Sequence, residues 1–299
     1  MIPLLKKINS LLAFFAIWEY PLQKEEIELF LGENVAQEIL NQHFVALEGK
    51  YYSTISDTEL LKKRRAEAEI FSEVIQKKAR KFAKILRHFP FLRCVSLCNT
   101  GAMGPVSKDS DIDFFLITKK GRIWTARFWS TFFFHIIGLR AKRTDTSGKF
   151  CLSFYIDEEF GSFEKLKKPH DIYLPFWIFT LQPFWGKPYF EKFWEENKSW
   201  ISKEYGIPQP DMKIIHWDEN SEKESILQKI LEFFQPNFFE QIFRAILLLK
   251  SKKFRNPNSP EYAPDMIFEN DIQKLHNPDL RNEIQEKWEA HYQNLKSKI

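Results

Sequence analysis

Three short apolar runs, separated by one turn of small residues and one helical segment, constrain the fold of this chain more than any other feature. The runs at 92–97, 112–118 and 150–156 are rich in β-branched and aromatic residues and have the length of buried strands. Between the second and third runs, residues 122–139 have apolar side chains at helical spacing. The order strand, turn, strand, helix, strand predicts a small core with a mixed β-sheet.

The first 56 residues are expected to form a separate N-terminal module. They read as three short helices followed by a hairpin that turns at Glu48-Gly49. This order resembles a winged helix, a fold that often places its third helix in the DNA major groove. The third expected helix, 35–42, has no Lys or Arg to meet phosphates, so duplex DNA is not the expected partner. A packing or protein-contact module is the preferred interpretation.

A long helix with one basic face is predicted to join this module to the sheet. Ser56 and Glu59 have the spacing of a capping box, and the helical pattern continues to about residue 88. We interpret the basic face as solvated, with a track for phosphates or RNA as the alternative. From residue 171 onwards the pattern indicates a helical C-terminal region. The chain is therefore predicted to be an α+β protein with divisions at 1–56, 57–160 and 161–299.

Composition favours a cytoplasmic globular protein without membrane contact. The longest apolar stretch, 128–139, is well short of the roughly 20 residues that a spanning helix needs. The start of the chain has no recognisable signal peptide. The three cysteines, Cys94, Cys98 and Cys151, are too few for a disulfide framework, and their odd number suits reduced thiols. Cys94 and Cys98 lie four residues apart in one predicted strand, but no His or Cys cluster completes a zinc site, so packed thiols are expected.

Two acidic residues at the start of the second strand are the main candidates for chemistry. In a strand, Asp111 and Asp113 project to the same face because side chains alternate with a period of two. Adjacent carboxylates repel each other unless a cation lies between them, and Mg²⁺ prefers oxygen ligands of this kind. The alternative interpretation is a polar turn leading into an ordinary strand.

The turn after the first strand is a candidate for binding phosphate. Residues 99–104 are small, and such a turn can present backbone N–H groups to an anion. Gly101 and Gly104 would leave room for close approach. Phosphoryl or nucleotidyl transfer needs both parts, since metal ions there neutralise the charge that develops on phosphate oxygens.

This stretch resembles the signature of the DNA polymerase β-type nucleotidyltransferases. In that family a Gly-Ser pair is followed, about ten residues later, by two acidic residues with one hydrophobic residue between them. Here Asn99-Thr100 stands in place of the pair, with ten residues before Asp111, and Gly104 matches a second glycine of small bacterial members. Asn is the commonest non-glycine residue at positive φ. The resemblance is most specific over about 92–156 and extends to a bacterial group with a winged-helix-like start and a helical tail.

The resemblance implies a metal-dependent enzyme with a nucleotidyltransferase core. Two Mg²⁺ ions, or Mn²⁺, would be held by Asp111 and Asp113, and an acceptor hydroxyl would attack the α-phosphate of a nucleoside triphosphate with release of pyrophosphate. The Thr100 hydroxyl and the N–H groups of 100–104 would hold the other phosphates, with support from Ser110. The acceptor stays open and could be a small molecule, a protein or RNA.

The chain departs from the family at the third metal carboxylate, which active members carry on a later strand. The run 150–156 contains no acid, so Asp157 at its end is the candidate, and Asp145 is the alternative. This departure supports a second hypothesis, a nucleotide-binding scaffold or regulatory protein that keeps the fold without turnover. A third hypothesis, a winged-helix transcription regulator, is disfavoured by the acidic start. The segment 276–281 resembles the end of the same bacterial group, and a capped helix start explains it without a catalytic role.

Overall fold

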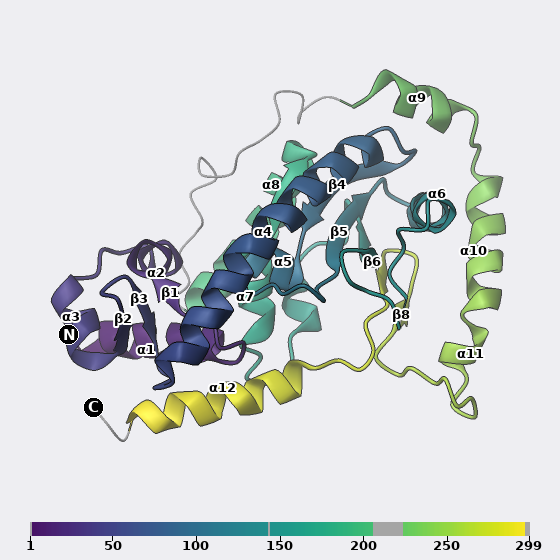
Figure 1. Cartoon of the computed structure of the whole chain (residues 1–299). Coiled ribbons are helices and arrows are strands. Elements are labelled where there is room, and N and C mark those ends of the chain that lie inside the picture. The colour runs from purple at the N-terminus through teal and green to yellow at the C-terminus, as the bar shows by residue number, and fades with distance from the viewer. Residues whose placement is uncertain (1, 143, 206–223, 297–299) are drawn as a thin grey trace.

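A six-stranded mixed sheet forms the centre of the protein. The computed structural model describes residues 2–142, 144–205 and 224–296 (Figure 1). The strands lie in the order β7-β4-β5-β6-β9-β8; β5 and β6 are parallel, and every other neighbouring pair is antiparallel. Their bounds are β4 (Leu92–Leu97), β5 (Ile112–Thr118), β6 (Phe150–Asp157), β7 (Gln182–Trp185), β8 (Ile267–Phe268) and β9 (Ile272–Lys274). The predicted α+β class with a mixed sheet is confirmed.

The three predicted strands and the helix between them are present. The helix is α6 (Ile123–Ile136), and the turn of small residues forms a short helix, α5 (Asn99–Met103). All residues of β4 and β5 are buried because helices cover both faces of the sheet. The long helix α4 (Thr58–Leu86) crosses one face (Figure 1).

Aromatic side chains fill both faces of the sheet. On the face covered by α4 and α6, the ring of Phe150 packs against Phe82 and Phe134 at centroid distances of 4.7 and 4.5 Å. On the other face, Phe115 packs against Trp177 at 5.3 Å. The aromatic residues that the sequence indicates as core are buried: Phe176, Trp177, Phe184, Trp185, Phe190, Phe193 and Trp194.

The N-terminal module has the three predicted helices and the predicted hairpin. Its elements are α1 (Ile2–Ala16), β1 (Leu22–Gln23), α2 (Lys24–Leu31), α3 (Gln37–His43), β2 (Val45–Leu47) and β3 (Tyr51–Ser53). The short strand β1 was not predicted, and it extends the hairpin to a three-stranded sheet. The module shares its core with the rest of the chain, since the ring of Phe14 stacks on Phe176 at 4.2 Å.

The remaining helices enclose the sheet, and the segments between them supply strands β7, β8 and β9. They are η1 (Phe163–Leu166), α7 (Tyr173–Phe179), α8 (Lys187–Tyr205), α9 (Ile226–Phe233), α10 (Phe238–Lys250), α11 (Lys252–Arg255) and α12 (Arg281–Lys296). Figure 1 shows α9, α10 and α11 as an arc outside α6, and α12 beneath the N-terminal module. Strands β7, β8 and β9, which lie beyond residue 160, complete the sheet.

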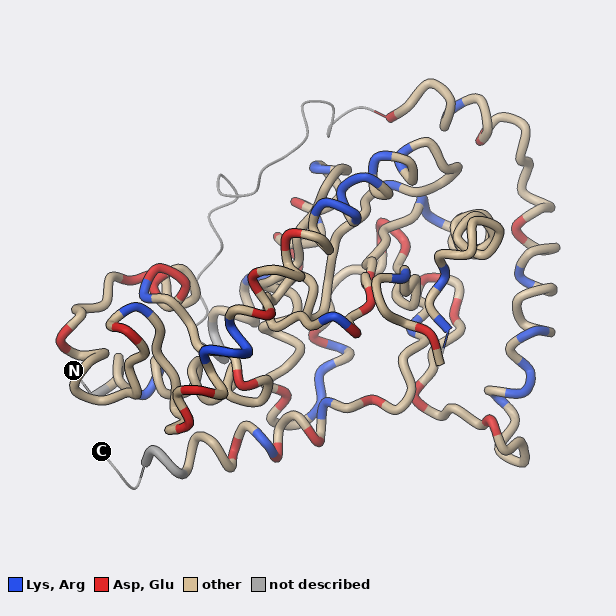
Figure 2. Tube along the Cα trace, in the orientation of Figure 1, with Lys and Arg blue, Asp and Glu red and all other residues tan. Residues whose placement is uncertain are grey.

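The basic face of α4 is partly used for packing. Figure 2 shows lysines and arginines along this helix. Arg65 is buried and donates to Glu26 at 2.9 Å, which ties α4 to the N-terminal module. The guanidinium of Arg80 lies over the ring of Phe184, 5.2 Å from its centroid. In the described ranges, no helix combines the length and apolar character needed to cross a membrane.

Candidate functional site

The two aspartates at the start of β5 lie together, as predicted. The side chains of Asp111 and Asp113 lie close enough that each changes the pKa of the other, which places both on the same side of the backbone. Asp111 is half-buried and Asp113 is 6% exposed. The turn residue Cys98 donates its backbone N–H to the carbonyl of Asp113 at 3.0 Å, which places the start of α5 beside the pair.

The electrostatics of the pair disfavour two negative charges at this position. Burial, followed by the charge of Asp111, raises the pKa of Asp113 to about 7, and burial also raises the pKa of Asp111. Two ionised carboxylates cannot hydrogen-bond to each other, so without a cation they share a proton. A divalent cation can take the place of that proton, because carboxylate oxygens are ligands for hard ions.

Asn99 positions Asp113, a role that the sequence did not reveal. Its φ of 55° confirms that this position needs a left-handed conformation. Its side-chain oxygen accepts from the Tyr173 hydroxyl at 3.2 Å and from Trp177 Nε1 at 2.7 Å. With the oxygen held by two donors, the amide nitrogen is left to face Asp113, whose pKa it lowers.

The two glycines of the turn serve packing rather than close approach to an anion. A Cβ on Gly101 would lie 3.2 Å from Leu97 Cδ1, and one on Gly104 would lie 2.8 Å from the Tyr20 hydroxyl. Both residues line a groove of about 700 Å³ between α4, β7 and the N-terminal module. The carbonyls of Gly101 and Ala102 accept hydrogen bonds from glutamine side chains on that side. Thr100 is half-buried in the first turn of α5.

Replacing Gly104 by Ala is expected to lower the free energy of unfolding by about 2–3 kcal/mol, from backbone strain and overpacking together. The φ of Gly104 is 114°, and the added methyl group would meet Tyr20. Gly49→Ala is the control, since Gly49 also has a positive φ of 66° but no atom within 4 Å of the added Cβ. Its expected cost is about 1 kcal/mol. Urea unfolding of both variants checks the prediction, and equal losses would contradict it.

Ser110 stabilises the loop that leads into Asp111. Its hydroxyl accepts from the N–H of Ser107 at 2.9 Å, and its carbonyl accepts from the N–H of Gly148 at 2.8 Å. The first contact closes the turn after α5, and the second joins it to the loop before β6. These two contacts hold the backbone next to Asp111 in place.

The structure does not bring Asp157 to the aspartate pair, and this part of the predicted site is corrected. Asp157 lies opposite Thr118 in the parallel pairing of β5 and β6, whereas Asp113 lies opposite Cys151. Thr118 is five residues beyond Asp113, roughly 16 Å at the usual rise of a strand. The Asp157 carboxylate instead accepts from the N–H of Glu159 at 2.9 Å. The alternative, Asp145, is exposed and forms an ion pair with Lys149.

A cysteine and a histidine face Asp113 in place of a third carboxylate. Ligand atoms of Asp113, Cys151 and His276 all lie within 4.8 Å of one another. Cys151 is the direct neighbour of Asp113 on β6. His276 follows β9, and its Nε2 lies 2.5 Å from the Ser153 hydroxyl. Burial lowers the pKa of His276 to about 4, so the imidazole is neutral at pH 7.

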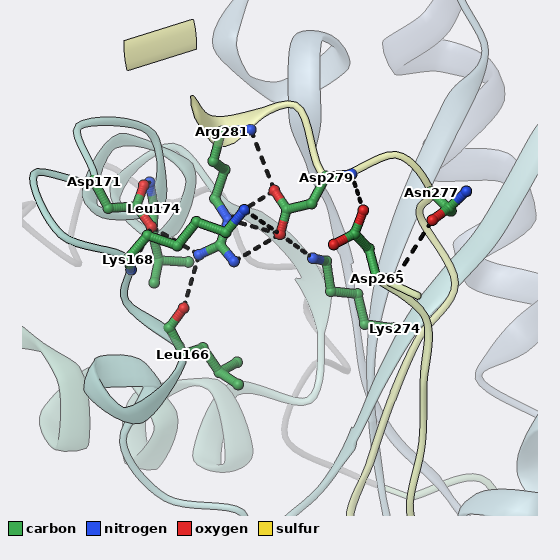
Figure 3. Close-up of polar contacts among 9 residues, drawn as sticks. All are labelled: Leu166, Lys168, Asp171, Leu174, Asp265, Lys274, Asn277, Asp279 and Arg281. Atoms are coloured by element: carbon green, nitrogen blue, oxygen red, sulfur yellow. Dashed lines mark hydrogen bonds and ion pairs between the residues drawn. The ribbon is translucent and has the colours of Figure 1, made fainter. Parts of the chain in front are cut away.

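A charged network holds the segment that carries His276 (Figure 3). Asp279 accepts from Lys274 at 2.6 Å and from Arg281 at 2.7 Å, and Arg281 also donates to Asp171 at 2.7 Å. Burial alone would raise the pKa of Asp279, but the hydrogen bonds from Arg281 and Lys274 outweigh it and hold that pKa well below its usual range. The segment 276–281 therefore leads into α12 and is also held in place by these ion pairs.

A cavity lies close to the aspartate pair, although neither aspartate lines it. It measures about 220 Å³, and Asn99 and His276, which both lie beside Asp113, form part of its wall. Aromatic side chains from β6 and α7 form another part, and Lys274 and Arg281, already paired with carboxylates, contribute the charged rim. The walls are largely apolar, which suits a small ligand with a planar or apolar body.

Comparison with known protein families, curated proteins and solved structures finds no match for this chain. The likeness to the polymerase β-type signature therefore stays a prediction that rests on the residues themselves.

Proposed function

We propose that this chain is a divalent-cation-dependent nucleotidyltransferase, which moves a nucleoside monophosphate from a nucleoside triphosphate to an acceptor hydroxyl. One observation carries the proposal: the carboxylates of Asp111 and Asp113 face each other at the start of β5, directly beside the turn into α5. The order of β4, α5, β5, α6 and β6 agrees with the nucleotidyltransferase core that the sequence resembles.

Asp111 and Asp113 would hold the cation, and Mg²⁺ or Mn²⁺ suits their oxygen ligands. A bound divalent ion supplies charge neutralisation at the phosphate oxygens and polarises the phosphorus centre. Asn99 fixes the rotamer of Asp113 through its amide nitrogen, so the carboxylate is oriented before substrate arrives. The Thr100 hydroxyl and the first N–H groups of α5 would be the donors for the remaining phosphates.

The cavity beside the pair supports a small acceptor or the base of the nucleotide as its occupant. At about 220 Å³ it is smaller than the several hundred Å³ of a drug-sized pocket. The aromatic rings of Tyr173 and Trp177 in its wall suit a planar group. A small molecule is therefore the acceptor class that we favour over RNA or protein.

The N-terminal module is proposed to pack or to contact protein, without reading DNA. In α3 the amide of Gln37 donates to Tyr52, and the Asn41 side chain accepts from the Tyr52 hydroxyl at 3.1 Å. These two polar groups of the third helix are occupied within the module. A helix that reads bases needs such groups free.

The second candidate is a nucleotide-binding scaffold without turnover. Its support is the neighbour of Asp113 on β6, where Cys151 stands at the position expected for a third carboxylate. Such a protein would bind a nucleoside triphosphate and release no pyrophosphate.

The test is an assay of the purified full chain with ATP, GTP, CTP and UTP, each with Mg²⁺ or Mn²⁺. Transfer predicts pyrophosphate release that depends on the cation and stops on chelation. Equilibrium dialysis with labelled triphosphate, run in parallel, separates the two candidates: binding without pyrophosphate, over a panel of small hydroxyl acceptors, favours the scaffold. Absence of both binding and release would sink the proposed function.

A further inference from the structure

We propose that Asp113, Cys151 and His276 form a binding site for a divalent transition-metal ion of the zinc class. Asp113 would be shared with the proposed magnesium pair, with one carboxylate oxygen for each ion. The ion would be held by one carboxylate oxygen, one thiolate sulfur and one imidazole nitrogen. The proposal goes beyond nucleotidyl transfer and stands on the geometry of these side chains alone.

The three side chains converge from distant parts of the chain. Asp113 and Cys151 come from the parallel strands β5 and β6, where they are direct partners in the register. His276 lies in the segment between β9 and α12. Their ligand atoms lie within 4.8 Å of one another, which is close to the separations of roughly 3.3–3.6 Å in a tetrahedral zinc site. Small side-chain rotations close the difference.

The donor set selects against magnesium. Mg²⁺ takes oxygen ligands and is rarely bound by dedicated protein cages, whereas thiolate and imidazole ligands favour zinc and related ions. Of the three groups here, only Asp113 offers oxygen. A buried cluster of acid, thiol and imidazole without an ion must satisfy each polar group locally, and here the thiol of Cys151 donates to Ser153 at 3.1 Å.

The surroundings orient all three ligands. The amide nitrogen of Asn99 faces the carboxylate of Asp113. The Ser153 hydroxyl contacts both Cys151 and His276. The network of Asp279 and Arg281 fixes the segment that presents the histidine (Figure 3). Outer partners of this kind are typical of metal sites, because they set the orientation and the basicity of the ligands.

Three protein ligands leave one tetrahedral position open. Structural zinc sites are closed by four protein ligands, while sites that bind substrate or water keep a free position. His276 also lines the cavity of about 220 Å³, so the open position can be reached from there. Asp111, on the same side of the backbone as Asp113, stands beside the same centre.

The experiment measures metal binding directly, without reference to turnover. The full chain is stripped with a chelator and titrated with Co²⁺, whose absorption reports tetrahedral geometry and, in the near ultraviolet, a thiolate ligand. We expect one equivalent of Co²⁺ with a thiolate band, displaced by stoichiometric Zn²⁺ and resistant to a large excess of Mg²⁺.

Variants assign the ligands. Cys151→Ser is expected to remove the thiolate band and to weaken binding by about 100-fold or more, because loss of an outer partner alone costs 10–100-fold. Cys94→Ser is the matched control, since Cys94 is a buried thiol in β4 whose neighbour is the Ser96 hydroxyl at 3.6 Å. It should keep the band. His276→Gln should weaken binding without removing the band.

Three results would contradict the proposal: a Co²⁺ spectrum without a thiolate band, a thiolate band that survives Cys151→Ser, or displacement of Co²⁺ by Mg²⁺ at comparable concentration. Should Cys151→Ser fail to fold, X-ray absorption at the zinc edge of the parent decides, with one sulfur expected at about 2.3 Å. Pyrophosphate release is measured separately, so an inactive protein that binds Zn²⁺ through Cys151 upholds this site while the proposed function fails.

Discussion

Replacing Asp113 by Asn is expected to reduce the rate of pyrophosphate release on the order of 100-fold or more, because the charge stabilisation that a metal ion supplies amounts to several kcal/mol. The amide keeps the shape of the side chain and loses the negative charge that holds the cation. Asp109→Asn is the matched control, since Asp109 is an exposed acid two residues before Asp111. Its rate should stay close to that of the parent.

Loss of activity in Asp113→Asn would not result from unfolding. The raised pKa of Asp113 means that the folded protein prefers its neutral form. Its contribution to stability is fully present below the usual aspartate pKa and is lost as the pH rises through about 7. An uncharged Asn avoids this loss, so without divalent cations the variant should melt at or above the temperature of the parent at pH 8. Equal pyrophosphate release by Asp113→Asn and the parent would show that the pair is not the site.

Arg281→Met is expected to lower the free energy of unfolding by about 3–5 kcal/mol, as removal of one partner from a buried ion pair does. The change leaves the carboxylates of Asp171 and Asp279, 0% and 5% exposed, without the guanidinium that joins them. Lys287→Met is the matched control on the same helix. The Lys287–Glu283 pair is more than half exposed, so its loss should cost less than about 1 kcal/mol.

Arg281→Met should also change how the free energy of unfolding depends on pH in the acid range. The pKa of Asp279 is depressed in the folded state, so its contribution is present above the usual aspartate pKa and declines as the pH falls toward the depressed value. The difference in the free energy of unfolding between the parent and Arg281→Met should therefore shrink below about pH 4. Urea unfolding between pH 3 and pH 7 measures it, and a difference that does not depend on pH would contradict this account of Asp279.

The central strands were predictable because their signals are local. The runs that became β4, β5 and β6 are short and apolar, and the helix between the last two has its own period. Strands β8 and β9, of two and three residues, carry no comparable pattern; β9 joins the sheet by pairing with β6, and β8 by pairing with β9. These two strands were not predicted, since tertiary pairing leaves little trace in so short a segment.

The candidate site was predictable only where a single strand sets the geometry. Asp111 and Asp113 share a side because strand residues alternate, and this follows from sequence alone. Asp157 was expected near them, but the parallel register puts it at the other end of β6. Cys151 could have been found from that register, whereas His276 lies 163 residues beyond Asp113 and is brought in by the ion pairs of Arg281.

The packing of α12 against α1 has a consequence for how the chain acquires its shape. Trp288 donates its indole N–H to the carbonyl of Ser10 at 2.9 Å, across 278 residues of sequence. At the usual speed of translation, roughly 5–20 residues per second, the first helix waits some tens of seconds for this partner. The flank of α1 that α12 covers therefore has to wait for the C-terminal helix, and His276 is synthesised before that docking step is complete.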